Sequence, residues 1–249
     1  MTLITGHRGA RNLWPENSLT GFRNVLELDV DAIEFDVHQT DAGELVVIHD
    51  ATLDRTVAAT GPVHALEPHR RSSLRLKDSS DNIPTLDEVL SVLAPATDKA
   101  LHIEIKSALD GQPYPGIIEK VIAEITRFDL ASRSYLTSFD VAVLEACRHQ
   151  APGIARLVSV NEDWAERQGG LKTFLSRVQP CVEIVAIHHV LMEKEWDLIT
   201  AMLPRNRLCV WILNEDWLIK RWLERGIGHL TSDNPDLALK LKASTSVHA

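Results

Sequence analysis

The stretch that decides the fold comprises residues 34–50 and reads EFDVHQTDAGELVVIHD. Two short runs rich in apolar and β-branched residues flank the polar segment TDAG, which is typical of a β-hairpin. Glu34 and Asp36 lie two positions apart on the first run, so their side chains project from the same face. If the turn closes near the alanine and glycine of that segment, Asp36 lies opposite His49 on the returning strand. The sequence therefore predicts two carboxylates and an imidazole at one point.

Two carboxylates held this close repel each other, and burying them is costly unless a cation neutralises their charge. A metal site is therefore one interpretation of Glu34 and Asp36. A surface hairpin with solvated acids is the other, and it is the more common outcome for an isolated pair of this spacing. The motifs elsewhere in the chain decide between them.

Length and composition narrow the class of protein. The chain has 249 residues, close to the size of one (β/α)-barrel domain, and its 45% hydrophobic and 24% charged residues are ordinary for a globular protein. The formal net charge of -9 argues against a nucleic-acid partner or an anionic membrane, so an anionic substrate would need a local basic pocket. A small-molecule substrate remains the expected partner, and a homo-oligomer is left open.

The three cysteines, Cys147, Cys181 and Cys209, are far apart and form neither a disulfide framework nor a zinc pattern. We expect them to be small buried residues in a reducing compartment. The sequence shows no signal peptide at Met1 and no apolar run of membrane-spanning length. A cytoplasmic protein without a stable membrane anchor is therefore expected.

Strand and helix signals alternate along the chain. Strands are predicted at 3–5, 32–37, 101–106, 134–139, 154–160, 184–188, 208–213 and 229–231, with helices at 19–28, from 84, and at 116–128, 141–149, 171–178, 193–202, 217–225 and 234–242. Eight parallel strands alternating with helices predict a (β/α)8 TIM barrel as one domain over residues 1–249. The hairpin return at 45–49 is an extra antiparallel strand, and the polar segment 51–82 is a small insertion after it. Residues 243–249 are expected to form a frayed tail.

Two helix starts carry capping signals. Asn17 is predicted to be the N-cap of the helix at 19–28, although this would leave Glu16 and Asn17 with a purely structural role. Thr85 and Glu88 have the spacing of a capping box.

The strand at 101–106 alternates polar and apolar residues, whereas a central parallel strand is usually apolar throughout. His102, Glu104 and Lys106 share one face. Charge directed into a barrel is costly, so it indicates a function. An edge strand with solvated charges is the alternative.

In a barrel of this kind, functional residues lie where the strands end. The polar or aromatic residues at predicted strand ends are His7, Arg8, Glu34, Asp36, Glu104, Lys106, Phe139, Trp211 and Asp233. The three carboxylates Glu34, Asp36 and Glu104 would form an all-oxygen site suited to one Mg²⁺ or Ca²⁺ ion, whereas zinc would require histidine or cysteine ligands.

Positive charge and imidazoles accompany these carboxylates. Arg8 and Lys106 would attract a phosphate group, which arginine can bind in a bidentate manner. His7 and His49 are suited to proton transfer near neutral pH.

Through these residues and the motifs that contain them, the chain resembles the glycerophosphodiester phosphodiesterase family over nearly its whole length. The motifs that carry the resemblance are His7-Arg8-Gly9, Pro15-Glu16-Asn17, Glu34-Phe35-Asp36-Val37, the segment ending in His49-Asp50, Asp54-Arg55-Thr56, Ile103-Glu104-Ile105-Lys106, Ser138-Phe139, Trp211 with Asn214, and Ser232-Asp233 with Pro235. The first six are highly specific in combination.

The resemblance implies a role for each residue type. His7 and His49 would be the acid–base pair, and the carboxylates Glu34, Asp36 and Glu104 would be the metal ligands. Arg8 and Lys106 would contact phosphate, while Phe139 and Trp211 would shape the glycerol pocket. The family also implies a barrel with an insertion after the hairpin.

Two stretches depart from the family pattern and leave the alcohol pocket open. The chain has Ile212-Leu213 between Trp211 and Asn214, where the family often has threonine after the tryptophan, and residues 228–232 lack the usual aspartate and isoleucines.

The resulting hypothesis is metal-dependent hydrolysis of glycerophosphodiesters, such as glycerophosphocholine, to sn-glycerol 3-phosphate and an alcohol. A lysophospholipase-D-type activity is the alternative, and it would require an apolar groove or an exposed apolar insertion near the site. A catalytically silent binding protein would be expected to have lost a histidine or a carboxylate from the set, and all five are present. The preferred alcohol, the choice of cation and the identity of the catalytic base remain open.

Overall fold

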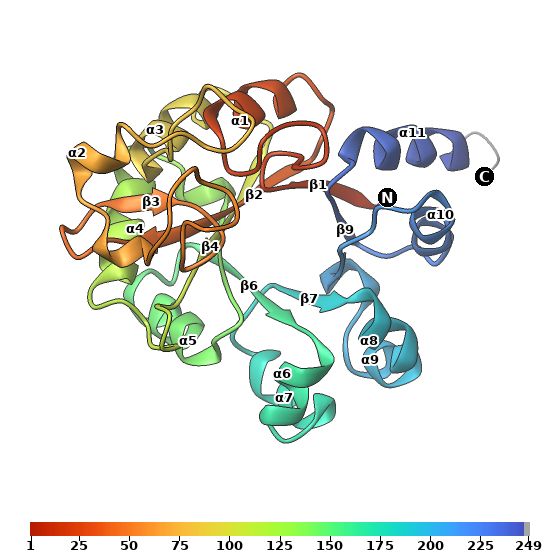
Figure 1. Ribbon diagram of the computed structural model, residues 1–249. Helices are drawn as coiled ribbons and strands as arrows, with labels where there is room; N and C mark the ends of the chain where they lie inside the picture. The colour runs from red at the N-terminus through yellow and green to blue at the C-terminus, as the bar shows by residue number, and fades with distance from the viewer. Residues whose placement is uncertain (247–249) are drawn as a thin grey trace.

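Eight parallel strands form a closed barrel in the computed structural model, which describes residues 1–246 (Figure 1). They are β1 (Leu3–His7), β2 (Ala32–Gln39), β4 (Ala100–Ile105), β5 (Ser134–Ser138), β6 (Ala155–Val160), β7 (Ile184–His188), β8 (Leu208–Trp211) and β9 (His229–Ser232), while β3 (Leu45–Val47) pairs antiparallel with β2. Because β1 pairs with both β2 and β9, the sheet closes on itself. The predicted (β/α)8 fold is confirmed.

The helices lie between the strands on the outside of the barrel (Figure 1). They are α1 (Leu19–Val25), α2 (Pro68–Arg71), α3 (Leu86–Leu93), α4 (Ile117–Arg127), α5 (Val141–Gln150), α6 (Glu162–Arg167), α7 (Leu171–Val178), α8 (His189–Lys194), α9 (Trp196–Met202), α10 (Asp216–Glu224) and α11 (Pro235–Ser246), with single 3₁₀ turns at Val63–Ala65, Ala131–Arg133 and Arg205–Arg207. No helix within residues 1–246 is long and apolar enough to cross a membrane.

Three helix predictions need correction. The predicted helix at 193–202 is two helices, α8 and α9, because Glu195 between them departs from helical angles (φ -113°, ψ 22°). The short helix α6 was not predicted. The expected fraying from residue 243 is wrong as far as 246, because α11 continues to Ser246, and residues 247–249 lie outside the described part of the chain.

The hairpin between β2 and β3 forms as predicted, but its register differs by one residue. Asp36 lies opposite Ile48, whose amide donates to the Asp36 carbonyl oxygen at 3.1 Å. The predicted opposition of Asp36 and His49 is therefore wrong. The turn closes on a pair formed by Thr40 and Glu44, which shifts every partner by one position.

The cap of α1 also differs from the prediction. Ser18 has the extended backbone that an N-cap requires, and its hydroxyl accepts from the amide of Gly21 at 2.8 Å. Asn17 is instead in the left-handed region (φ 54°), and its side chain points to the functional site. The capping box formed by Thr85 and Glu88 at the start of α3 is confirmed.

Strand β4 shows how the core and the site share one element. Leu101, Ile103 and Ile105 are buried in the layer between strands and helices, packed with residues of α3 and α4. His102 and Glu104, on the opposite face, line a cavity within the barrel. Since β4 pairs with β2 on one side and β5 on the other, the edge-strand alternative is wrong.

The segment 51–82 packs against the hairpin. Arg71 of α2 pairs with Glu44, the residue that precedes β3. Apolar residues of the segment form a buried cluster with hairpin residues Val46 and Ile48 and with Ile83. The members from the segment are Leu53, Val57, Val63, Leu66 and Leu76. This cluster ties the segment to the strand that precedes His49.

Candidate active site

A cavity of about 100 Å³ opens at the carboxyl ends of the strands. Seven of the nine predicted site residues line it, namely His7, Arg8, Glu34, His49, Glu104, Phe139 and Trp211. The other two, Asp36 and Lys106, lie directly behind this surface, within 3.3 Å of each other. Below the rim, the cavity extends into the barrel between residues that include His102, Thr137, Ser159, Ala186 and Thr231.

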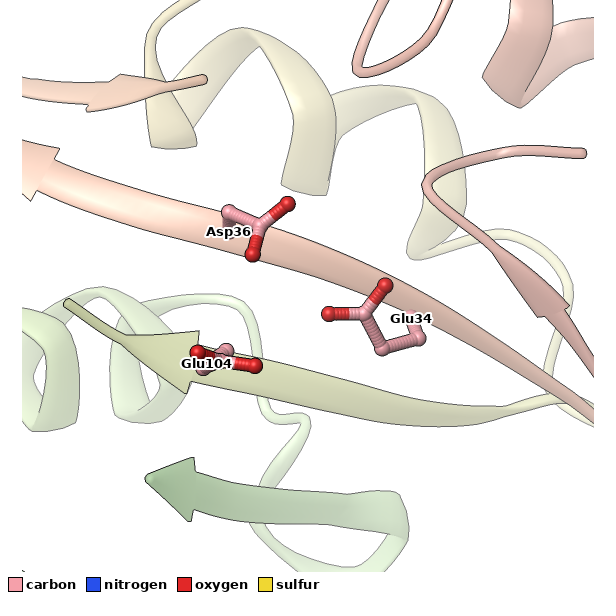
Figure 2. Close-up of side chains that lie close together, drawn as sticks. All are labelled: Glu34, Asp36 and Glu104. Carbon is pink, nitrogen blue, oxygen red and sulfur yellow. The ribbon is translucent and has the colours of Figure 1, made fainter. Parts of the chain in front are cut away.

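Three carboxylates converge from two neighbouring strands. Glu34 and Asp36 project from β2, and Glu104 projects from β4, where its backbone lies in register with Asp36. One oxygen from each side chain can be chosen so that all three lie within 4.8 Å of one another. Figure 2 shows the three side chains gathered over the same region between the two strands. Alternation along each strand places them on one face.

Of the three clustered carboxylates, Asp36 has the most cationic partners. Lys106 Nζ lies 3.3 Å from one of its oxygens, and Arg8 Nε lies 3.4 Å from the other. The Asn17 side-chain amide donates to this second oxygen at 2.9 Å. Burial acts to raise the pKa of Asp36, but Lys106 and Arg8 overcome it and hold that pKa well below its ordinary value. Asp36 is therefore ionised.

Glu34 experiences the opposite balance. Burial, followed by repulsion from Asp36 and Glu104, raises the pKa of Glu34 well above its ordinary value. When all three carboxylates are ionised, their negative charge exceeds the positive charge of Arg8 and Lys106 beside them. Oxygen donors with excess negative charge are what Mg²⁺ and Ca²⁺ require, so the donor set fits one hard divalent cation.

The turn after β1 brings the chain close to these carboxylates. Arg8 has a positive φ of 51°, and its amide donates to Glu34 Oε2 at 3.1 Å. Gly9 follows at φ 73°, and a Cβ atom there would lie 3.2 Å from the ring of Phe22. Glycine is therefore needed at position 9 both for its backbone angle and for the close packing of this turn.

His7 is held by a carboxylate from the opposite end of the chain. Its Nδ1 lies 2.6 Å from Asp233 Oδ1, and its Nε2 lies 3.7 Å from Glu34 Oε2. Asp233 in turn accepts from the Asn214 side-chain amide at 2.8 Å and pairs with Arg11 Nε at 3.0 Å. Because the Asp233 carboxylate accepts the bond, Nδ1 carries the proton and Nε2 faces the cavity.

His49 has an equivalent partner, its neighbour Asp50, at 2.7 Å from Nδ1. Its backbone is also held, because His38 Nε2 lies 3.1 Å from the His49 carbonyl oxygen. That oxygen can only accept, so the second nitrogen of His38 accepts from the Tyr114 hydroxyl at 2.8 Å. His49 is thus fixed through both its ring and its main chain.

Both histidines are neutral near pH 7. Burial lowers the pKa of His7 even though the hydrogen bond to Asp233 raises it. Burial likewise lowers the pKa of His49, opposed by the negative charge of Asp36. A neutral imidazole whose Nδ1 carries the proton presents a free Nε2 lone pair, which is the form that can accept a proton.

Aromatic residues form part of the cavity wall. The rings of Phe139 and Trp211 meet edge to face with centroids 5.7 Å apart. Trp164 packs on the far side of Phe139 at 6.2 Å, and His188 packs on Trp211 at 5.1 Å. These contacts give one side of the cavity a fixed apolar surface.

Sequence reasoning missed several of these partners. The sequence indicated Asp50 and Asn214 only as parts of motifs, Asn17 as a cap and a motif residue, and Asp233 as a strand-end residue without a partner. Position offered a signal for two of them, because Asp50 directly follows His49 and Asp233 follows the last strand. Nothing in the sequence marked His38 and Tyr114, which meet across 76 positions.

The sequence of this chain matches a known protein family and several of its members. The model of the glycerophosphoryl diester phosphodiesterase family matches residues 7–237. A glycerophosphodiester phosphodiesterase from Caldanaerobacter subterraneus subsp. tengcongensis is 29% identical, covering 96% of this chain and 97% of the relative. Another from Bacillus altitudinis is 28% identical, covering 97% and 98%.

Solved structures agree. A glycerophosphodiester phosphodiesterase from Agrobacterium tumefaciens superposes with a TM-score of 0.77 at 25% identity, covering 96% of this chain and 99% of that one. A phosphodiesterase from Oleispira antarctica, solved with its product sn-glycerol-3-phosphate, has a TM-score of 0.74 at 21% identity, covers 100% of this chain and 98% of that one, and supports the fold. With its barrel, its site and a family match over residues 7–237, the chain belongs to the glycerophosphoryl diester phosphodiesterase family.

Proposed function

We propose that this enzyme hydrolyses glycerophosphodiesters to sn-glycerol 3-phosphate and an alcohol. One observation carries the proposal: two histidines, each anchored by a carboxylate, lie in one cavity beside three clustered carboxylates. The names of the full-length relatives and the product bound to the Oleispira antarctica phosphodiesterase support the choice of substrate class.

In this proposal Glu34, Asp36 and Glu104 hold one divalent cation, Mg²⁺ or Ca²⁺. The close grouping of the three carboxylates, with oxygens within 4.8 Å of one another, supports a cation there, because its charge would relieve their mutual repulsion. A cation bound there would polarise the phosphate oxygens and stabilise the negative charge that develops in the transition state.

The cationic side chains would orient the phosphate. Arg8 lies on the cavity wall, and Lys106 lies behind it. Glu104 and Asp36 overcome the effect of burial and raise the pKa of Lys106, so both side chains are charged at every physiological pH. A planar guanidinium can bind two phosphate oxygens, while an ammonium acts as a point charge.

The two histidines would divide the proton transfers between them. One Nε2 would accept a proton from the hydroxyl that attacks phosphorus, which belongs either to water or to the adjacent glycerol carbon. The other ring, which must first take up a proton from solvent because it is neutral at rest, would donate that proton to the oxygen of the departing alcohol as its bond to phosphorus breaks. Asp233 and Asp50 keep Nδ1 protonated, which directs both Nε2 atoms to the reaction. Each transfer typically accelerates a reaction by about 10²- to 10⁴-fold.

A lysophospholipase-D-type activity is supported less well. Such an activity would require an apolar surface near the site, which the segment 51–82 would provide if its apolar residues were exposed. The apolar residues of its cluster are buried against the hairpin instead. The apolar wall formed by Phe139 and Trp211 would then shape the glycerol pocket of a small diester.

The chain would act as one catalytic domain with residues 51–82 as an insertion. All three cysteines are free thiols, which supports a reducing, cytoplasmic location. A small soluble diester is the expected partner.

The metal proposal is tested by chelation and by substitution. Assays of purified enzyme against a panel of glycerophosphodiesters should show turnover that is lost in excess chelator and restored by Mg²⁺ or Ca²⁺. Glu34→Gln and Glu104→Gln should each abolish that turnover, because a neutral amide attracts a hard cation less strongly. Glu145→Gln, an exposed glutamate on α5, is the matched control and should behave like the parent enzyme. Full activity in excess chelator would refute the carboxylate site.

A further inference from the structure

We propose that Arg55, which lies on the segment 51–82, positions two functional side chains at once. Through Asp50 it orients His49, and through Glu16 it orients Arg8. This inference rests on the proposed function, which makes His49 an acid–base residue and Arg8 a phosphate ligand. Arg55 itself is a positioning residue, because its side chain bonds to Asp50 and Glu16 and does not line the cavity.

The first half of the arrangement is a two-pronged contact with Asp50. Arg55 Nε donates to Asp50 Oδ2 at 2.6 Å, and Arg55 Nη2 donates to Oδ1 at 3.2 Å. Asp50 Oδ1 is the oxygen that accepts from His49 Nδ1 at 2.7 Å. Two hydrogen bonds from one guanidinium to both oxygens of a carboxylate fix the plane of that carboxylate. Arg55 therefore sets the direction in which Asp50 holds the His49 ring.

The second half is a matching contact with Glu16. Arg55 Nη1 donates to Glu16 Oε2 at 2.7 Å, and Nη2 donates to Oε1 at 2.8 Å. Glu16 Oε1 also accepts from Arg8 Nη1 at 3.1 Å. The charges thus alternate from Arg8 through Glu16 and Arg55 to Asp50. Arg8 lines the cavity at one end, and at the other end Asp50 holds His49, which also lines it.

The exposure of the Arg55 side chain indicates that its ion pairs orient the site residues more than they stabilise the fold. The Arg55 side chain is 44% exposed, compared with 28% for Asp50 and 13% for Glu16. Exposed ion pairs of this kind contribute little to the free energy of unfolding. Their geometry is nevertheless demanding, because one guanidinium makes four hydrogen bonds to two carboxylates.

Removing Arg55 should loosen the ring of His49 without releasing its backbone. His38 still holds the His49 carbonyl, and the buried cluster still holds the segment. Asp50 would be free to rotate away from Nδ1, and Glu16 would keep Arg8 at 3.1 Å and Arg11 at 3.8 Å as its cationic partners. The expected consequence is a lower kcat, together with a smaller rise in KM through Arg8.

The test compares Arg55→Ala, Arg55→Lys and Asp50→Asn with Arg75→Ala. Arg75 is the matched control, since it is an exposed arginine of the same segment that donates to the carbonyl of Ser80. Arg55→Ala should lower kcat by about 10- to 100-fold, less than the loss of an acid–base group itself. Arg55→Lys should recover only part of this loss, because an ammonium lacks the fork. Added guanidinium should partly rescue Arg55→Ala and should not affect Arg75→Ala.

Coupling and spectroscopy distinguish positioning from a structural role. The double variant Arg55→Ala/Asp50→Asn should be little slower than the slower single variant. Multiplicative losses would overturn the proposal, as would a parental kcat for Arg55→Ala. If Arg55→Ala does not fold, Arg55→Lys carries the same comparison.

A second readout does not depend on turnover. The ¹⁵N chemical shifts of the His49 ring should report a single Nδ1-protonated tautomer in the parent and in Arg75→Ala, and mixed tautomers in Arg55→Ala. An unchanged spectrum in Arg55→Ala would refute the positioning role. Failure of the parent enzyme to hydrolyse any glycerophosphodiester would instead refute the proposed function, and this spectrum would still test Arg55.

Discussion

The two histidine–carboxylate pairs of the site have the same local geometry and very different origins. His7 and Asp233 are 226 positions apart and meet because β9 lies beside β1 in the closed barrel. His49 and Asp50 are adjacent in the sequence. The Asp233 side chain is 1% exposed, whereas that of Asp50 is 28% exposed. The barrel shields the first pair, while the second lies near solvent.

This difference explains why the supports of the two pairs differ. Asn214 and Arg11 hold the buried Asp233, with the protein excluding competing water. Asp50 is held by Arg55 from a segment outside the barrel. Closure of the sheet places Asp233 beside His7, at the end of a barrel strand. For His49, which follows the hairpin, the proposed positioning residue is Arg55, acting through Asp50.

The largest expected effect is the loss of kcat when either histidine is replaced, and it should be similar for the two pairs. His7→Ala and His49→Ala should each lower kcat by about 10²- to 10⁴-fold, because in the proposed mechanism each variant loses one proton transfer. The double variant should be little worse than the worse single variant, since the histidines act on one reaction. Turnover of a glycerophosphodiester is the measurement, and His149→Ala, an exposed histidine on α5, is the control. Losses that multiply in the double variant would show that the histidines act separately.

A sharper comparison replaces each carboxylate by its amide. Asp233→Asn should lower kcat by about 10²- to 10⁴-fold, because an amide can leave His7 in the wrong tautomer with no water to compensate. Asp50→Asn should cost about 10- to 100-fold, because solvent at this more exposed pair can partly replace the carboxylate. Steady-state kcat values for the two variants measure the difference. Equal losses would mean that burial does not distinguish the pairs.

The smallest expected effect concerns stability and pH. The hydrogen bond from His7 overcomes the effect of burial and lowers the pKa of Asp233 to about 2. Because the folded pKa lies below the unfolded value, Asp233 stabilises the fold above about pH 4, and this contribution disappears as the pH falls toward 2. For a buried group the shift corresponds to about 2 kcal/mol at neutral pH.

The pKa of Asp50 is also lowered to about 2, with the hydrogen bonds from Arg55 and His49 overcoming burial. Solvent screens this more exposed group, so its contribution should be below about 1 kcal/mol. Urea unfolding at pH 7 should therefore show a larger loss for Asp233→Asn than for Asp50→Asn. At pH 3 the gap between the two losses should be smaller than at pH 7, and it should close as the pH falls to 2 and below, because both carboxylates are then protonated. A gap that persists unchanged at pH 3 would contradict the assignment to carboxylate ionisation.

Much of the fold and part of the site could be predicted because they depend on local patterns. Alternation along 101–105 placed Glu104 on one face and the apolar residues on the other, and β4 has this arrangement. Strand ends were predictable to within a residue or two, so Glu34, Asp36 and Glu104 could be grouped before their distances were known. The register of the hairpin was missed because a change of one residue in the turn moves every partner across it.

The sequence by itself determined which residue types follow each strand, because the period of a strand and the apolar face that it buries are properties of neighbouring residues. Only the tertiary structure decided the partners: Asp233 for His7, Glu16 for Arg55 and Asn17 for Asp36. These contacts join segments separated by 226, 39 and 19 positions. Closure of the barrel and docking of the segment 51–82 bring them together. The physical reason is that a side chain's identity states what it can bind, whereas its partner is set by which strands and loops the folded chain places beside it.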